Sequence, residues 1–289
     1  MKIAIIGGYG KLGCWLARFL LGEGHEVTIT GRDQKKLAEV GRQIGAGTAS
    51  NTEATASSDA VVISVPIGKF EEVVQQIAPH THAGQLILDV TSIKEMPVQV
   101  MHRYIKNGTV LGTHPMFGPG AKGIKGQKFV LTPVNKHESA LAEKVRQYLE
   151  DNGAGVVTMT PAEHDHIMSI VLALSHFIAL VSADTLLSLD KLQDTAKADG
   201  TTYRMLLTLA ESVLSEDPDF YASLQMHLPD AAAVEELFST RAAQWAELAR
   251  RKDSRQFVQK MNHMRDEFIK RDPNFARAYK DMYRLIDRL

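Results

Sequence analysis

The sequence predicts a doubly wound α/β sheet in the first half of the chain and an all-helical domain in the second half. Short runs rich in Val and Ile alternate with helical patterns up to about residue 160, and strand signals disappear beyond it. Strands that are apolar along almost their whole length are typical of a parallel sheet covered on both faces. Alternation of such strands with helices is typical of a doubly wound fold.

The individual elements follow from these patterns. Strands are expected over residues 2–7, 26–30, 60–66, 85–91, 109–114, 128–133 and 155–159. Helices between several of these strands are expected over residues 11–22, 34–43, 69–78 and 137–152.

The domain boundary is predicted at residue 160, where a strong helix start appears. Thr160 offers a capping hydroxyl, Pro161 takes the first helical position and Glu163 completes a capping box. We therefore expect a first domain over residues 1–160 and a helical domain over residues 161–289.

The helical domain is expected to contain one long first helix and several others. Large apolar residues recur at three- and four-residue steps from Ile167 to Ile178, which predicts a helix with an apolar face. Further helices are expected over residues 203–215, 219–227, 230–251, 254–271 and 273–288.

Composition places the chain among ordinary globular proteins. Of its 289 residues, 44% are hydrophobic and 23% are charged, and the formal net charge is −1, so no overall field favours nucleic acid or an anionic membrane. The first apolar run is too short for a signal peptide, and no stretch is expected to reach the roughly 20 apolar residues of a membrane span. The single cysteine, Cys14, excludes an internal disulfide. We therefore expect a cytoplasmic protein with no nucleic-acid or membrane partner.

A glycine-rich turn follows the first predicted strand directly and opens a helix. Its residues are Gly8, Tyr9, Gly10, Lys11, Leu12 and Gly13. In such a turn the first glycine allows a tight bend, the second lets a pyrophosphate approach the backbone, and the third lets helix and strand pack closely. The phosphates then lie at the positive end of the helix. We expect these residues, together with Ser64 and Pro66 at the end of a later strand, to form a Rossmann-type dinucleotide site.

The end of the second predicted strand indicates which nicotinamide cofactor is preferred. NAD-binding sites usually carry an Asp or Glu there, whereas this chain has Thr30-Gly31-Arg32-Asp33. A small hydroxyl residue followed by an arginine suits the 2′-phosphate of NADP. We therefore expect Thr30 and Arg32 to favour NADP over NAD. Asp33 could cap the next helix instead of binding the cofactor. In the alternative interpretation Arg32 is a solvated surface charge.

Polar side chains gather at the ends of two later strands. Ser92 lies in the segment Asp89–Lys94 and His114 in the segment Gly112–Pro119, each beside an apolar strand. In open α/β sheets the ligand crevice lies beyond the carboxyl ends of the strands. His114 suits general-base chemistry because imidazole titrates near neutrality, and the alternative is a structural histidine.

With these segments the chain resembles the prephenate/arogenate dehydrogenase family of tyrosine biosynthesis. The matching segments occur in order along nearly the whole chain: GGYGKLG, DVTSIK, GTHPMFGP, EHD followed by ALSHF, and DPDFY. The resemblance implies that the ring carbon bearing the 4-hydroxyl of prephenate gives a hydride to the nicotinamide, while the ring carboxylate leaves as CO₂ and 4-hydroxyphenylpyruvate forms. It implies that His114 accepts the hydroxyl proton, that Ser92 hydrogen-bonds this hydroxyl and that His176 contacts the substrate. It also implies a homodimer formed through the helical domain.

Two positions depart from the family pattern. Gly120 stands where an acidic residue usually follows HPMFGP, and Ser212 stands where many members carry an arginine for the substrate carboxylate. Because those two residues can pair in the family, their joint absence is interpreted as one coordinated change. Arg204 is the first candidate for the replacement cation, and Lys122 is the second.

The departures leave alternatives open. The substrate could be arogenate or an amino-substituted prephenate, and a non-catalytic NADP(H)-binding sensor dimer is the alternative of another class. A sensor would not need the Ser92 and His114 pair, which favours an enzyme. His164 and His166 flank Asp165, but neighbours on a helix point in different directions, so no metal site is expected.

Overall fold

The computed structural model describes residues 1–287, which form two compact units. The first unit is Met1–Met168, and the second unit begins at Ser169. The division falls within a continuous helical run, Pro161–Ser188, whose start agrees with the capping box of Thr160 and Glu163.

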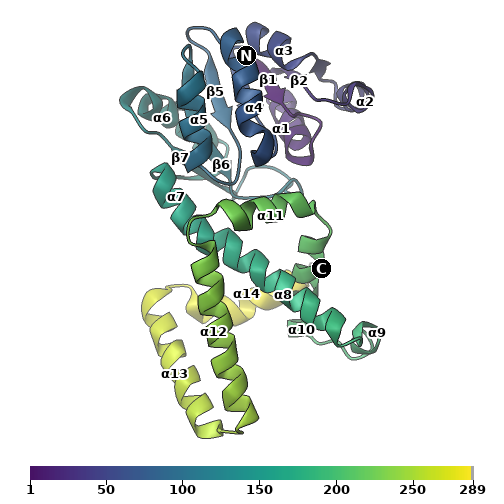
Figure 1. Ribbon diagram of the computed structural model, residues 1–289, viewed down its shortest axis with the longest axis vertical. Helices are drawn as coiled ribbons and strands as arrows, with labels where there is room; N and C mark the ends of the chain where they lie inside the picture. Colours follow the sequence, from purple (N-terminus) through teal and green to yellow (C-terminus); the bar gives the residue numbers. More distant parts are fainter. Residues whose placement is uncertain (288–289) are drawn as a thin grey trace. The chain divides into compact units, whose positions relative to one another are not determined.

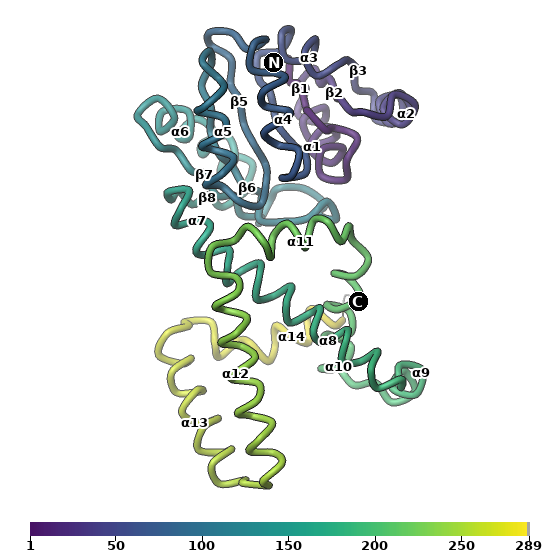
Figure 2. Tube along the Cα trace, in the orientation of Figure 1, coloured from purple at the N-terminus to yellow at the C-terminus, as the bar shows by residue number. Residues whose placement is uncertain are grey.

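An eight-stranded sheet forms the centre of the first unit, in the order β3-β2-β1-β4-β5-β6-β7-β8. Its strands are β1 Lys2–Ile6, β2 Glu26–Ile29, β3 Gly47–Thr48, β4 Ala60–Ile63, β5 Leu86–Asp89, β6 Thr109–Pro115, β7 Lys128–Thr132 and β8 Gly155–Thr158. Neighbouring strands are parallel except for β6 and β7, which are antiparallel. A parallel neighbour needs a crossover, usually a helix, and the described residues 116–127 between β6 and β7 form a loop instead. The chain can be followed through this loop and into β8 in Figure 2.

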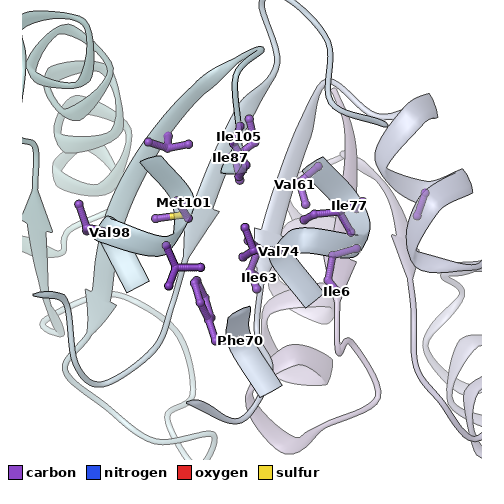
Figure 3. Close-up of a cluster of buried hydrophobic side chains, with 14 residues drawn as sticks. Ile6, Val61, Ile63, Phe70, Val74, Ile77, Ile87, Val98, Met101 and Ile105 are labelled. Carbon is purple, nitrogen blue, oxygen red and sulfur yellow. The ribbon is translucent and has the colours of Figure 1, made fainter. Parts of the chain in front are cut away.

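Helices cover both faces of the sheet, as the doubly wound prediction requires. On one face, α4 (Ile67–Ile77) and α5 (Glu95–Tyr104) pack against the central strands, with α3 (Asn51–Ser57) beside them (Figure 1). Figure 3 shows the cluster that they bury, and its labelled members are Ile6, Val61, Ile63, Phe70, Val74, Ile77, Ile87, Val98, Met101 and Ile105. Burial of a large apolar side chain contributes about 1.5–3 kcal/mol. This packing therefore holds the ends of β4 and β5, where the site residues lie, in a fixed place.

The opposite face is covered by α1 (Lys11–Gly22), α2 (Gln34–Ile44) and α6 (Lys136–Asp151). The apolar sides of α1 and α2 meet β1, β2 and β4, and α6 packs on β6 and β7. A cavity of about 520 Å³ with a mainly apolar lining remains between α1 and α6. It lies on the face of the sheet and contains neither Ser92 nor His114.

Four elements of the first unit were not predicted from the sequence. They are the two-residue β3, the short polar helix α3, the 3-10 turn Ala78–His80 and the helix α5. The helix α3 has too few apolar residues for a periodic signal, although Ser50 and Glu53 form a complete capping box. In α5, Pro97 lies within the first turn, where proline is compatible with a helix.

The second unit consists of helices, as predicted. They are the π-helical segment Ser169–Leu174, α8 Ser175–Ser188, α9 Leu192–Thr195, α10 Thr201–Leu214, α11 Pro218–His227, α12 Ala231–Arg250, α13 Ser254–Arg271, a short 3-10 turn Phe275–Arg277 and α14 Ala278–Ile286. The predicted last helix ran to residue 288, which lies outside the described residues. Small residues such as Ala173, Ala179 and Ala183 are buried in this unit, while many large apolar side chains are exposed.

The expectation that no stretch of the chain is long and apolar enough to cross a membrane was wrong. The helical run Pro161–Ser188, which includes α7 (Pro161–Met168), has 28 residues, and its most apolar window reaches a mean hydropathy of 2.0. Length and composition alone cannot distinguish a membrane span from a core or interface helix, because the latter can be equally apolar.

Candidate active site

The turn at the end of β1 has no room for a side chain at three of its glycines, Gly7, Gly8 and Gly13. A Cβ on Gly13 would lie 2.6 Å from the carbonyl oxygen of Gly7, and one on Gly8 would lie 2.6 Å from Ile29. Gly7 itself has a φ of +85°, and a Cβ there would approach the Ser64 carbonyl oxygen to 2.4 Å. The ends of β1 and β4 thus meet at a tightly packed turn, in which Gly7 and Gly10 are partly exposed.

The helix α1 begins at this turn without a side-chain cap. Its N-cap residue is Gly10, which offers no side chain to the first amide groups of the helix. Lys11 and Leu12 lie in the first turn of the helix, and Lys11 is exposed. A helix start without a side-chain cap, together with the close-packed glycines, fits the pyrophosphate of a dinucleotide.

The end of β2 separates a buried hydroxyl from exposed cations. The Thr30 hydroxyl is buried; it accepts a hydrogen bond from the Gly7 amide at 3.3 Å and donates one to Asn51 Oδ1 at 2.6 Å. It therefore holds the glycine turn in place, and the structure gives it no open face for a phosphate. Arg32 is exposed, and Asp33 accepts from two amides of α2, which is its alternative capping role.

Tyr9 and Lys36 also lie near the end of β2. The Tyr9 ring lies over Gly31, where a Cβ would be 1.8 Å from the ring, and Lys36 Nζ is 5.1 Å from the ring centroid. Lys36 was not singled out in the sequence, although its position in the first turn after Arg32 places a second cation here. Pro66 is the exposed N-cap residue of α4, next to the end of β4.

The turn between β5 and α5 is organised by a buried ion pair. Lys94 and Asp89 have no exposed side-chain surface, and the Lys94 ammonium donates to the Asp89 carboxylate. The ammonium also donates to the Thr113 carbonyl oxygen at 2.7 Å and to the Thr91 hydroxyl at 3.2 Å. These bonds tie the turn that carries Ser92 to the neighbouring strand β6.

His114 occupies the penultimate position of β6 and is only 5% exposed. Its Nδ1 lies 2.8 Å from Nε2 of His164, and Nδ1 of His164 lies 2.7 Å from the Asp165 carboxylate. Asp165 also accepts from the backbone amides of Lys94 at 2.7 Å and Glu95 at 2.9 Å. A chain of contacts thus runs from the start of α5 through α7 to His114.

Burial and neighbouring cations keep these imidazoles neutral. Burial lowers the pKa of His114 well below its usual value, and the nearby His164 and Lys94 lower it further. Burial also lowers the pKa of His164, although its bond to Asp165 opposes this effect. Neutral imidazole has one nitrogen that can accept a proton, which a general base requires.

The loop after β6 carries Gly120, which departs from the family pattern, and Lys122, the second candidate for the replacement cation. Both residues are exposed. Trp15 of α1 donates from Nε1 to the Ala121 carbonyl oxygen at 2.6 Å, and its ring packs edge-on against Phe117 at 5.0 Å. The first helix of the glycine motif thus also fixes this loop.

The remaining predicted substrate residues belong to the second unit. His176 packs edge-on against Tyr221 with ring centroids 4.8 Å apart, and burial lowers its pKa. Its Nδ1 is buried and makes no hydrogen bond within the described residues. Arg204 is half exposed and lies 3.7 Å from Asp199, while the exposed Ser212 donates to the Leu209 carbonyl oxygen.

Four site residues were not assigned a role from the sequence: Asp89, Lys94, His164 and Asp165. A lysine followed by the start of a helix gives no sign that its side chain is buried. The adjacent His164 and Asp165 belong to a segment that matches the family, but the only role weighed for them was metal binding. In residues 1–287 no group of three or more acidic, histidine or cysteine side chains could hold a metal. The sequence feature that could have drawn attention to His164 and Asp165 is the strong helix start at Thr160, which places them in the first turns of a helix.

A glycine turn at β1 and a buried histidine at the end of β6 define a dinucleotide-binding Rossmann protein with a helical second unit. Profiles of known families identify both units. The profile "Prephenate dehydrogenase, nucleotide-binding domain" matches residues 16–158, and "Prephenate dehydrogenase, dimerization domain" matches residues 160–263. The chain therefore belongs to the prephenate dehydrogenase family, as the resemblance predicted.

Individual relatives agree with this family. A probable arogenate/prephenate dehydrogenase of Methanocaldococcus jannaschii is 36% identical over 272 residues, which cover 93% of this chain and 61% of the relative. The chain thus spans about three fifths of the length of that protein. The crystal structure of prephenate dehydrogenase from A. aeolicus, in complex with hydroxyphenyl propionate and NAD+, superposes with a TM-score of 0.77 at 21% identity and covers 94% of this chain and 98% of that chain.

A shorter match covers about a quarter of the chain. An F420-dependent NADP reductase of Methanothermobacter thermautotrophicus is 41% identical over 76 residues, which cover 23% of this chain and 33% of that protein.

Proposed function

We propose that the protein oxidises and decarboxylates a cyclohexadienyl carboxylate of the prephenate type with a nicotinamide dinucleotide. The observation that carries this proposal is a neutral, buried His114 at the same edge of the sheet as an uncapped glycine turn. Family membership supplies the substrate class.

The residues divide the work as follows. Gly8 and Gly10 would hold the pyrophosphate of the dinucleotide at the start of the helix that Gly13 lets pack closely, and the nicotinamide would supply the hydride acceptor when bound. His114 takes the proton of the ring hydroxyl, and Ser92 hydrogen-bonds that hydroxyl. The ring carboxylate leaves as CO₂, and aromatisation of the ring makes the reaction effectively irreversible.

NADP is the proposed cofactor. An exposed Arg32 follows β2 where NAD-binding sites usually place an acid, and Lys36 adds a second cation beside it. Guanidinium binds phosphate through two parallel hydrogen bonds. The relative that is 41% identical over 76 residues is named as an F420-dependent NADP reductase, which supports this choice.

The substrate's side chain distinguishes prephenate from arogenate, which bears an amino group. Gly120 and Ser212 leave two family positions without their charges, so an amino-bearing substrate such as arogenate is the alternative to prephenate. A relative named as an arogenate/prephenate dehydrogenase is compatible with both.

A turnover assay tests these proposals together. NADP or NAD reduction is followed by absorbance with prephenate, arogenate and an amino-substituted prephenate in turn. We expect turnover with at least one acid and faster turnover with NADP. Tight NADP binding without turnover of any of them would indicate a sensor and not an enzyme.

Arg204 is proposed to hold the substrate carboxylate that the family arginine holds elsewhere. A buried carboxylate needs a cationic partner, and the Arg204 guanidinium is half exposed, with only a distant contact to Asp199. Arg204→Ala should reduce kcat/KM by roughly 2–5 kcal/mol, mainly through KM. Wild-type kcat/KM in Arg204→Ala with a loss in Lys122→Ala would assign this role to Lys122.

The dimerization domain over residues 160–263 supports a homodimer. Large apolar side chains exposed on the single chain, such as Ile170 and Val171, are suited to burial between two copies. We also propose that the boundary between the two domains lies at residue 160. The proposed location of the protein is the cytoplasm.

A further inference from the structure

Deep burial poses a problem for the base of the proposed reaction. His114 is 5% exposed, so water cannot solvate the imidazolium that forms when it takes a proton. The Lys94 ammonium is a further unfavourable neighbour, although Asp89 balances its charge. A base in this position needs a partner that fixes its lone pair and shares the positive charge.

The contacts of Asp165 set the direction of every hydrogen bond in the chain that ends at His114. Asp165 accepts from the amides of Lys94 and Glu95, as a carboxylate at a helix start does. His164 must therefore donate to Asp165 from Nδ1, which leaves its Nε2 as an acceptor in the neutral ring. His114 must then donate to that nitrogen from its own Nδ1, at 2.8 Å.

We propose that His164 and Asp165 are positioning residues that hold His114 in the tautomer protonated at Nδ1, with Nε2 free to take the substrate's proton. The inference rests on the proposed function for its catalytic meaning, while the tautomer itself is a property of the free protein. When Nε2 of His114 gains a proton, the ring becomes a cation whose Nδ1 proton faces His164. The positive charge is then stabilised through His164 by the Asp165 carboxylate.

The geometry distinguishes this arrangement from simple core packing. Two neutral imidazoles can only share a hydrogen bond if one donates and the other accepts, so their tautomers are linked. The charged groups that face the pair from the surrounding elements are Lys94 and Asp89 on the turn after β5 and Asp165 on α7. Of these, only Asp165 makes a hydrogen bond to either ring among the described contacts.

Substitutions at His164 separate polarity from packing. In His164→Gln the amide nitrogen can donate to Asp165 while its oxygen accepts from His114, which preserves the direction of both bonds. In His164→Met the volume is filled but the acceptor is lost. We expect His164→Met to lower kcat by about 10²-fold with little change in KM, and His164→Gln to recover most of this loss, since a base in the wrong tautomer loses orders of magnitude in rate. The exposed His80→Met serves as the matched control and should behave as the wild type.

The tautomer is measured directly, and without any variant, by NMR of protein labelled with ¹⁵N-histidine. His114 signals are assigned by their loss in His114→Asn. We expect the proton on Nδ1 in the free wild-type protein and a mixture of tautomers, or an Nε2 proton, in His164→Met. An Nε2 proton in the wild type would overturn the inference, and so would a His164→Met protein with wild-type kcat and pH profile. A wild-type protein with the proton on Nδ1 of His114 but no turnover would support the positioning role of His164 and Asp165 and would reject the proposed function.

Discussion

The two ends of the carboxyl edge of the sheet are built in different ways. At the cofactor end, β1, the glycine turn and α1 follow each other directly, and a Cβ on Gly13 would lie 2.6 Å from the carbonyl oxygen of Gly7. At the catalytic end, the contacts join His114 to His164 across 50 residues and Lys94 to Asp165 across 71. The first end is a backbone shape made by local spacing, and the second is a buried polar network made by distant segments.

The two ends also differ in how far their cationic side chains are exposed to water. Arg32 at the cofactor end is exposed, where water solvates it and salt screens it. Lys94 at the catalytic end has no exposed side-chain surface and depends on Asp89 for compensation. Changes at the catalytic end should therefore have larger effects than changes at the cofactor end.

Removal of the proposed base should have the largest effect. We expect His114→Ala to lower kcat by about 10²–10⁴-fold, the usual contribution of a general base. NADP affinity, measured by titration calorimetry, should survive because the glycine turn lies at the other end of the edge. Loss of NADP binding in this variant would show that the two ends are not independent and that His114 is structural.

Removal of the buried cation should cost stability. Lys94→Met leaves the Asp89 carboxylate buried without a cationic partner, which costs roughly 3–5 kcal/mol of the free energy of unfolding. Urea denaturation measures this loss. The double variant with Asp89→Asn and Lys94→Met removes both charges and should recover part of it; no recovery would mean that the pair is not the source of the cost.

Stability should also depend on pH through the two buried imidazoles. Their pKa values are lowered in the folded protein, so below the unfolded value of about 6.5 the unfolded chain binds protons that the folded protein does not. The free energy of unfolding should be unaffected by these groups above pH 7. It should fall between pH 6.5 and the lower folded values, by up to about 1.4 kcal/mol per pH unit for each imidazole.

The control for the pH effect is His114→Asn, which removes one of the two titrations. Its stability should fall less steeply over the same interval. An equal slope in both proteins would assign the pH dependence to other histidines.

The smallest effect is expected at the cofactor end. Arg32→Ala should reduce kcat/KM for NADP by about tenfold, or roughly 1.4 kcal/mol, and leave NAD turnover unchanged. Arg42→Ala, an exposed arginine in the last turn of α2, is the matched control. Equal use of NAD and NADP by the wild type would contradict the proposed cofactor preference.

The sequence was informative wherever a signal is local. The period of apolar residues located seven of the eight strands and the helical second unit, and the glycine spacing located the turn at β1. It did not reveal that β7 runs antiparallel to β6, because strand direction depends on how residues 116–127 return to the sheet. It assigned Thr30 to the cofactor, whereas the buried hydroxyl is bound to Gly7 and Asn51.

Helix and strand periods, caps and glycine turns depend on residues close in sequence, so the sequence by itself determined the fold class, the cofactor turn and His114 as the proposed base. The tertiary structure alone decided the environment of that base. Lys94, His164 and Asp165 acquire their roles only when α7 brings two of them to the start of α5 and the end of β6. The burial of a charge and the direction of a hydrogen bond depend on neighbours from distant segments, and no local pattern encodes them.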